Sequence, residues 1–189
     1  MQLPTWVPSN PQQDSAEFSW LLDHMAGAKS ILEIGSCLGL SLKGFATRLT
    51  PGAKIRSIDA GVCYDGEERF VSANNLLLSI QELDNSGFDA TVMLADSTWP
   101  QVIEWARENG PYDFVYIDGD HSYEGVKSDF ENYGPMGKLV GFHDIANHGH
   151  HTYGVVRFWN ELKSNGYRTQ EKVESYMGTG IVMQGLRND

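Results

Sequence analysis

Short apolar runs alternate along this chain with longer segments whose apolar residues recur at helical spacing. Runs such as ILEIG and DFVYID are apolar on both faces, which predicts strands that are covered on both sides. Segments such as LSLKGFATRL predict amphipathic helices between them. Strands are expected at 30–36, 54–59, 90–97, 113–118 and 137–144, with two more at 168–173 and 180–185; helices are expected at 14–27, 40–49, 66–87, 100–110, 123–134 and 154–166.

This alternation of strand and helix is typical of an α/β fold. It predicts one domain over residues 1–189, with a mostly parallel, seven-stranded sheet between two helix layers, a three-layer α/β/α sandwich. The last two strands are joined by a short connection, which favours a hairpin with an antiparallel last strand. Residues 1–13, with three prolines, are expected to form an irregular N-terminal arm.

The net charge of the chain limits the kinds of partner that are expected. The formal net charge of its 189 residues is −11 and its 14 basic residues are scattered, so nucleic acid is not expected as a partner. No apolar run approaches the roughly 20 residues that cross a bilayer, and the start has no signal-peptide pattern, so no membrane association and a cytoplasmic location are expected. Cys37 and Cys63 are accordingly interpreted as reduced thiols.

Polar residues gather where the first predicted strand ends: Glu33, Gly35, Ser36, Gly39 and Ser41. Glycines in a strand-to-helix turn let a ligand approach the backbone near a helix N-terminus. The dinucleotide pattern would need two further glycines, and no Gly-Lys-Ser/Thr follows, so neither a dinucleotide nor a nucleoside triphosphate fits. A tight turn without a ligand is the alternative.

The next four predicted strands also end in polar groups. Asp59 could accept hydrogen bonds from a ribose diol, and Asp96 with Ser97 could contact an adenine edge, although both places also suit turn or helix-capping residues. Asp118 ends the fourth strand, and the pair His143–Asp144 ends the fifth. Because ligands of open α/β sheets bind beyond the carboxyl ends of the strands, these groups are expected to converge on one rim.

The segments ILEIGSCLGLS, IRSID, ADS, YDFVYIDGDHSYEGVKSDF and LVGFHDI resemble the successive motifs of class I S-adenosylmethionine-dependent methyltransferases, which have a Rossmann-like fold. The later segments resemble the branch of cephalosporin-hydroxylase-like proteins and small O-methyltransferases. The resemblance covers the chain from about residue 12 to its end. It implies methyl transfer from S-adenosylmethionine, with a small molecule as acceptor and oxygen as the methylated atom.

Site residues follow from the same resemblance. Asp59 would hold the ribose hydroxyls, Asp118 would face the transferred methyl group, and His121, three residues later, would be the catalytic base. The loop that holds the methionine part would consist of Glu33, Gly35, Ser36, Gly39 and Ser41, and the adenine contacts would come from Asp96 and Ser97.

A divalent cation is also implied, because metal-dependent relatives bind one between acids that match Asp118 and Asp144. Those relatives often have asparagine after the second acid, where this chain has Ile145, and His143 precedes the acid instead. The expected ligands are thus Asp118, His143 and Asp144. Oxygen ligands favour Mg²⁺ or Mn²⁺, and Fe²⁺ or Zn²⁺ follow if imidazoles take part.

Several alternatives remain open. The same residues could form a metal-dependent hydrolase or oxygenase site, or the chain could be a binding module without chemistry. The acceptor pocket is either open or completed by a second copy in a homo-oligomer, and the loop with Tyr64 and Phe70 is a candidate cover. No role is assigned to His148, His150 and His151, and Glu124, Lys127 and Asp129 are expected on a solvated helix face.

Overall fold

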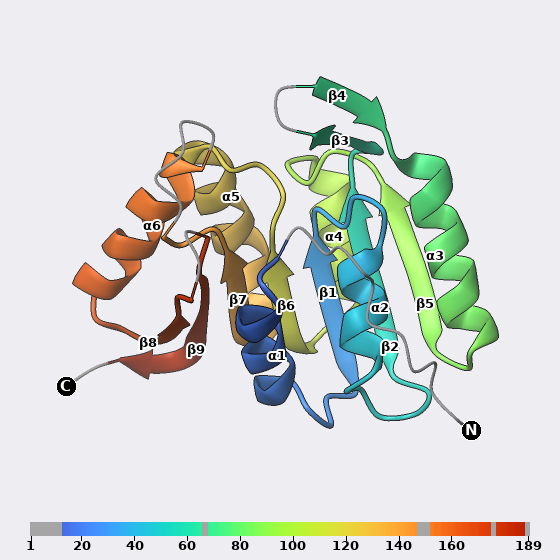
Figure 1. Ribbon diagram of the computed structural model, residues 1–189, viewed down its shortest axis with the longest axis horizontal. Helices are drawn as coiled ribbons and strands as arrows, with labels where there is room; N and C mark the ends of the chain where they lie inside the picture. Colours follow the sequence, from blue (N-terminus) through green and yellow to red (C-terminus); the bar gives the residue numbers. More distant parts are fainter. Residues whose placement is uncertain (1–12, 66–67, 147–151, 175–176, 188–189) are drawn as a thin grey trace.

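A computed structural model describes residues 13–65, 68–146, 152–174 and 177–187. Its main sheet has seven strands in the order β5-β2-β1-β6-β7-β9-β8, as Figure 1 shows. Every neighbouring pair from β5 to β7 is parallel, and β9 runs antiparallel between β7 and β8, which confirms the predicted sheet. The strands are β1 Ser30–Ile34, β2 Lys54–Asp59, β5 Asp89–Leu94, β6 Tyr112–Ile117, β7 Gly137–His143, β8 Tyr167–Lys172 and β9 Thr179–Arg187.

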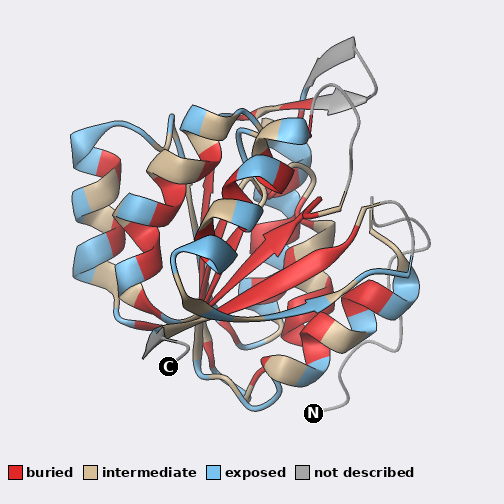
Figure 2. Ribbon diagram, turned by 90° about the vertical axis from the view of Figure 1, so that its left-hand side faces the viewer, coloured by how far each residue is buried: buried red, intermediate tan, exposed pale blue. Residues whose placement is uncertain are grey.

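Among the described residues, six α-helices cover the sheet in two layers. One apolar cluster joins one face of the sheet to α1, α2 and α3, and a second joins the other face to α4, α5 and α6. In Figure 2 the central strands and the inward helix faces are buried while the outer helix faces are exposed. The helices are α1 Ser15–His24, α2 Leu40–Ala46, α3 Ala73–Asn85, α4 Pro100–Asn109, α5 Tyr123–Tyr133 and α6 Tyr153–Ser164, with a 3-10 turn, η1, at Gly134–Met136.

Local chemistry explains where these helices begin. The Asp14 carboxylate accepts the amides of Ala16 and Glu17, and Ser122 accepts the amide of Gly125, so side chains cap α1 and α5. Pro100 occupies the first turn of α4, where its missing N–H costs no hydrogen bond. Within the described residues, no helix has the length and apolar composition of a membrane span.

The prediction that a long helix begins at residue 66 was wrong. Residues Val62–Asp65 and Glu68–Val71 form an antiparallel hairpin, β3–β4, outside the main sheet, and α3 begins only at Ala73. The aromatic and β-branched pair FV favours a strand before the helix. The side chains of Tyr64 and Phe70 lie outside the described residues.

The interpretation of the two cysteines as free thiols was also wrong. Cys37, in the turn after β1, and Cys63, in β3, form a disulfide with a Cα–Cα distance of 5.5 Å. They are 26 residues apart in sequence, but they meet because β1 and β2 are neighbours and β3 follows β2 directly. The glycine-bearing turn is therefore tied to the hairpin.

The aromatic cluster beneath α1 and α2 gives a test of core packing. Phe45 is fully buried, with ring centroids 5.4 Å from Phe18 and 5.3 Å from Tyr116. Phe45→Leu should lower the free energy of unfolding by about 1–2 kcal/mol, measured by urea denaturation, because the smaller side chain leaves part of the ring volume empty. Leu77→Ala is the control: this side chain is exposed, and its loss should change stability by less than about 0.5 kcal/mol.

Candidate active site

The parallel strands bring the predicted site residues to one edge of the sheet. The turn after β1 lies against the segment after β6: the Asp118 amide donates to the Ile34 carbonyl at 2.9 Å. Gly35 has φ +86°, and a Cβ there would lie 2.2 Å from the Asp118 carbonyl oxygen. Only glycine allows this approach, so Gly35 holds two strand ends together.

Glu33 is a fully buried carboxyl next to that turn. Neither of its oxygens has a hydrogen-bond partner among the described residues. Burial raises the pKa of Glu33 to about 8, although the nearby hydroxyls of Ser36 and Ser41 favour the charged form; Asp118 and Asp59 raise the pKa further. A buried acid without a charged partner is costly, and a cationic ligand group would relieve that cost.

The other predicted glycine, Gly39, makes a different contact. It has φ +75° and precedes α2, and a Cβ there would lie 2.7 Å from Cβ of Ser79 on α3. The Ser79 hydroxyl donates to the Leu38 carbonyl at 2.7 Å. Gly39 thus lets the turn pack against α3, and Ser41 lies in the first turn of α2.

Asp59, at the end of β2, organises the backbone around it. One of its oxygens accepts the Cys37 amide at 2.8 Å and the other accepts the Gly61 amide at 2.6 Å. Burial raises the pKa of Asp59, while these backbone hydrogen bonds oppose the shift. Each carboxylate oxygen can accept a second hydrogen bond, so Asp59 can still bind a ligand hydroxyl.

Asp96 and Ser97 form the turn after β5. Asp96 is exposed and accepts both the amide and the hydroxyl of Thr98, at 2.8 and 2.7 Å, which lowers the pKa of Asp96. The Ser97 hydroxyl donates to Asp129 on α5 at 2.7 Å. The solvated position expected for Asp129 was therefore wrong: its side chain is 1% exposed.

The ends of β6 and β7 bring two acids and two histidines into contact. Nδ1 of His143 lies 3.3 Å from Oδ1 of Asp118 and 3.4 Å from Oδ2 of Asp144. His121 bridges the same acids, with Nε2 3.1 Å from Asp118 and Nδ1 3.5 Å from Asp144. Asp144 has the left-handed φ of +58°, which is uncommon outside glycine and is tolerated best by aspartate and asparagine.

Mutual attraction within this cluster controls its protonation. Burial would raise the pKa of Asp118, but His143 and His121 lower it to about 2. Burial would lower the pKa of His143, but Asp118 and Asp144 raise it to about 9. Burial would lower the pKa of His121 as well, but Asp118 and Asp144 raise it above its usual value. The acids thus stabilise positive charge on both imidazoles.

Three of these residues also form a cation-binding geometry. One ligand atom each from Asp118, His143 and Asp144 lies within 4.8 Å of the others. Two carboxylate oxygens and an imidazole nitrogen fit a divalent cation. Nε2 of His143 is buried without a hydrogen-bond partner among the described residues, so only Nδ1 faces the acids. His148, His150 and His151 lie outside the described residues.

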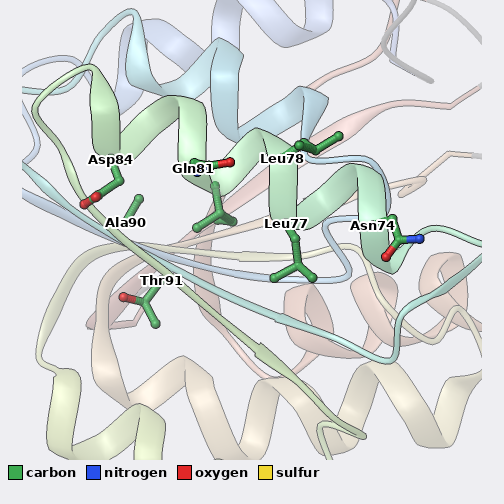
Figure 3. Close-up of a pocket in the computed structure, with 8 residues that line it drawn as sticks. Asn74, Leu77, Leu78, Gln81, Asp84, Ala90 and Thr91 are labelled. Carbon is green, nitrogen blue, oxygen red and sulfur yellow. The ribbon is translucent and has the colours of Figure 1, made fainter.

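A surface hollow away from this edge has a different character. It lies between α3 and β5, one of the two outer strands of the sheet, as Figure 3 shows. None of the predicted site residues lines it, and its walls carry only one acid and no histidine or cysteine. The lining includes Asn74, Leu77, Leu78, Gln81, Asp84 and Thr91. Asp84 is its single acid and has no second ionisable group beside it in the lining, so no function is assigned to this hollow.

Residues 32–145 match the family described as "Methyltransferase domain". This match spans more than half of the chain and runs from β1 to the residue after Asp144. The chain belongs to this methyltransferase-domain family. The family boundaries therefore enclose every strand end that carries a site residue, together with the hairpin β3–β4.

Individual relatives of this methyltransferase-domain chain are more distant. It is 27% identical over 148 residues to the uncharacterized protein y4gI of Sinorhizobium fredii, covering 76% of this chain and 16% of that protein. It is 22% identical over 149 residues to caffeoyl-CoA O-methyltransferase 1 of Nicotiana tabacum, covering 76% and 58%. The chain thus spans less than two thirds of the length of either relative.

A solved O-methyltransferase from Bacillus cereus, in complex with SAH, has the same fold. The TM-score is 0.62 at 17% sequence identity, and the match covers 94% of this chain and 84% of that one. At such low identity the likeness concerns the fold alone.

Proposed function

We propose that this chain transfers the methyl group of S-adenosylmethionine to an oxygen atom of a small-molecule acceptor. The observation that carries the proposal is the cluster of Asp118, His121, His143 and Asp144, which lies directly beside the glycine turn after β1. Family membership and the names of the relatives, which include O-methyltransferases, support the same activity. They favour methyl transfer over a hydrolase or oxygenase on this scaffold.

The cofactor would bind across the ends of β1, β2 and β5. Buried Glu33 would receive the ammonium group of its methionine part, because that contact gives the orphaned carboxyl a charged partner. The turn of Gly35, Ser36, Gly39 and Ser41 would surround the same part. Asp59 would accept the ribose hydroxyls, and Asp96 with Ser97 would contact adenine.

The chemistry requires alignment and the removal of one proton. Methyl transfer is a displacement at carbon, so the enzyme must hold the acceptor oxygen in line with the methyl group and sulfur. Neutral His121 would take the acceptor proton, and Asp118 and Asp144 would stabilise the imidazolium that forms, at contacts of 3.1 and 3.5 Å.

Asp118, His143 and Asp144 would hold a divalent cation, with Mg²⁺ or Mn²⁺ expected first. When bound, such a cation lowers the pKa of an acceptor hydroxyl and orients it. The residues of this chain would hold that hydroxyl beside the cluster, where Asp118 faces the transferred methyl group. Hydroxylated aromatic compounds such as caffeoyl-CoA are a first acceptor class to test, by analogy with the named relative.

Titration with S-adenosylhomocysteine in a calorimeter tests the cofactor assignment. We expect a dissociation constant in the micromolar range, and Asp59→Asn should weaken binding about tenfold because the amide replaces one ribose acceptor by a donor. Asp84→Asn, in the hollow beside α3, is the matched control and should bind like the parent chain. Absence of binding at millimolar ligand would refute the proposed function.

A further inference from the structure

Helix α5 carries a buried acid that the proposed mechanism does not use. Asp129 is 1% exposed; its Oδ1 accepts the Ser97 hydroxyl, and its Oδ2 has no hydrogen-bond partner among the described residues. Burial raises the pKa of Asp129 to about 7 against the opposing Ser97 hydrogen bond, and Asp120 and Asp96 raise it further. Burying this carboxyl carries a free-energy cost that the Ser97 hydrogen bond offsets only in part.

The same face of α5 makes a second contact with Ser97. The hydroxyl of Tyr133, one helical turn after Asp129, donates to the Ser97 carbonyl at 2.5 Å. The hydroxyl and the carbonyl of Ser97 are therefore both held by one helix. The turn after β5 cannot rotate about Ser97 without breaking both hydrogen bonds.

Asp129 also contacts the segment that leads away from the methyl-transfer residue. A Cβ on Gly119 would lie 3.4 Å from Oδ2 of Asp129 and 3.2 Å from the Ile34 side chain. Asp129 thus lies between the turn proposed to contact adenine and the segment directly after Asp118. Its hydrogen bond to Ser97 connects it to the turn proposed to contact adenine.

The contact has a chemical consequence for Ser97. A hydroxyl has one proton to donate and can accept with its oxygen. When an ionised Asp129 accepts the hydrogen bond of that hydroxyl, the Ser97 oxygen can act toward a ligand as an acceptor only. An adenine amino group can donate to such an oxygen, whereas the 6-oxo group of hypoxanthine offers another acceptor and is repelled.

We propose that Asp129 is a positioning residue that fixes the Ser97 hydroxyl as an acceptor and so makes the cofactor site selective for adenine over hypoxanthine. This inference rests on the proposed function, because it requires the nucleoside to lie against Ser97. Tyr133 holds the same turn through the Ser97 carbonyl and does not set the direction of the Ser97 hydroxyl. Asp96 and Asp120 are the other acids that act on Asp129.

The test compares two probes, S-adenosylhomocysteine and S-inosylhomocysteine, by calorimetry at pH 8, where Asp129 is ionised. The parent chain should bind the adenosyl compound at least about tenfold more tightly. In Asp129→Ala the Ser97 hydroxyl can turn and donate, so the ratio of the two dissociation constants should fall toward one. Asp129→Asn keeps a carbonyl oxygen at this position and should restore most of the ratio.

Ser97→Ala removes the hydroxyl from a partly exposed position and keeps the test valid if Asp129→Ala fails to fold. In Ser97→Ala the ratio of the two dissociation constants should also fall toward one. The double variant Asp129→Ala/Ser97→Ala should show the same ratio as Ser97→Ala, because Asp129 acts through Ser97. The inference is overturned if the parent chain does not discriminate, if Ser97→Ala keeps the parent ratio, or if Asp129→Asn behaves like Asp129→Ala. Failure of the parent chain to bind either probe would instead refute the proposed function.

Discussion

Replacing Asp118 by asparagine is expected to lower kcat/KM for methyl transfer by about 10³-fold. Asp118 contacts both His121 and His143, at 3.1 and 3.3 Å, so the substitution removes the negative charge that stabilises a protonated His121 and turns one of the three charged or imidazole ligands of the cation geometry into a neutral amide. The measurement is transfer of a labelled methyl group to an acceptor that the parent chain methylates. Binding of Mn²⁺, followed by calorimetry, should weaken in parallel.

The matched control is Asp120→Asn, the same change two residues away. Asp120 is exposed, and its Oδ1 accepts the Ser122 amide, a role that an asparagine oxygen can keep. We expect kcat/KM within about twofold of the parent value. If Asp118→Asn were as active as Asp120→Asn, the placement of the chemistry at Asp118 would be wrong.

Replacing Glu33 by glutamine should change how stability depends on pH. The pKa of Glu33 is about 8 in the folded chain, above the ordinary 4.5, so between these pH values the folded chain holds a proton that the unfolded chain has released. The stability due to the protonated Glu33 is complete below pH 4.5 and is lost as the pH rises through 8, by at most about 5 kcal/mol. Glu33→Gln carries no such proton and should not show this loss.

The measurement is the free energy of unfolding in urea at pH 5, 7 and 9 for both proteins. The parent chain should lose stability relative to Glu33→Gln by several kcal/mol across this range. Glu124→Gln, on the exposed side of α5, is the control and should follow the parent chain at each pH. A constant difference between the parent chain and Glu33→Gln would mean that Glu33 ionises normally in the folded chain.

Some features of this protein follow from local patterns in the sequence. Apolar runs without polar alternation gave the five parallel strands, and their order with the helices gave a sheet covered on both faces. Because carboxyl ends of parallel strands share one edge, the sequence also indicated that Glu33, Asp59, Asp96, Asp118 and Asp144 gather there. This inference works because it needs only strand direction, which the alternation of strand and helix determines.

The burial of Asp129 could also have been predicted from the sequence, although we expected this residue on a solvated face. Val126, Asp129, Phe130 and Tyr133 recur at the spacing of one helix face, and all four are buried. The charge of Asp129 led to the expectation that it is solvated. Its position in the helix instead places it on the same face as its apolar neighbours. The partner that makes its burial tolerable, Ser97, lies 32 residues away in sequence.

Other features were decided only by the tertiary structure. The meeting of Cys37 with Cys63, the bridge of His121 between Asp118 and Asp144, and the burial that raises the pKa of Glu33 all depend on which segments become neighbours across strands. Sequence patterns specify the direction and period of each element, because those depend on adjacent residues. Distances and desolvation depend on the packing of elements far apart in the chain, which no local pattern records.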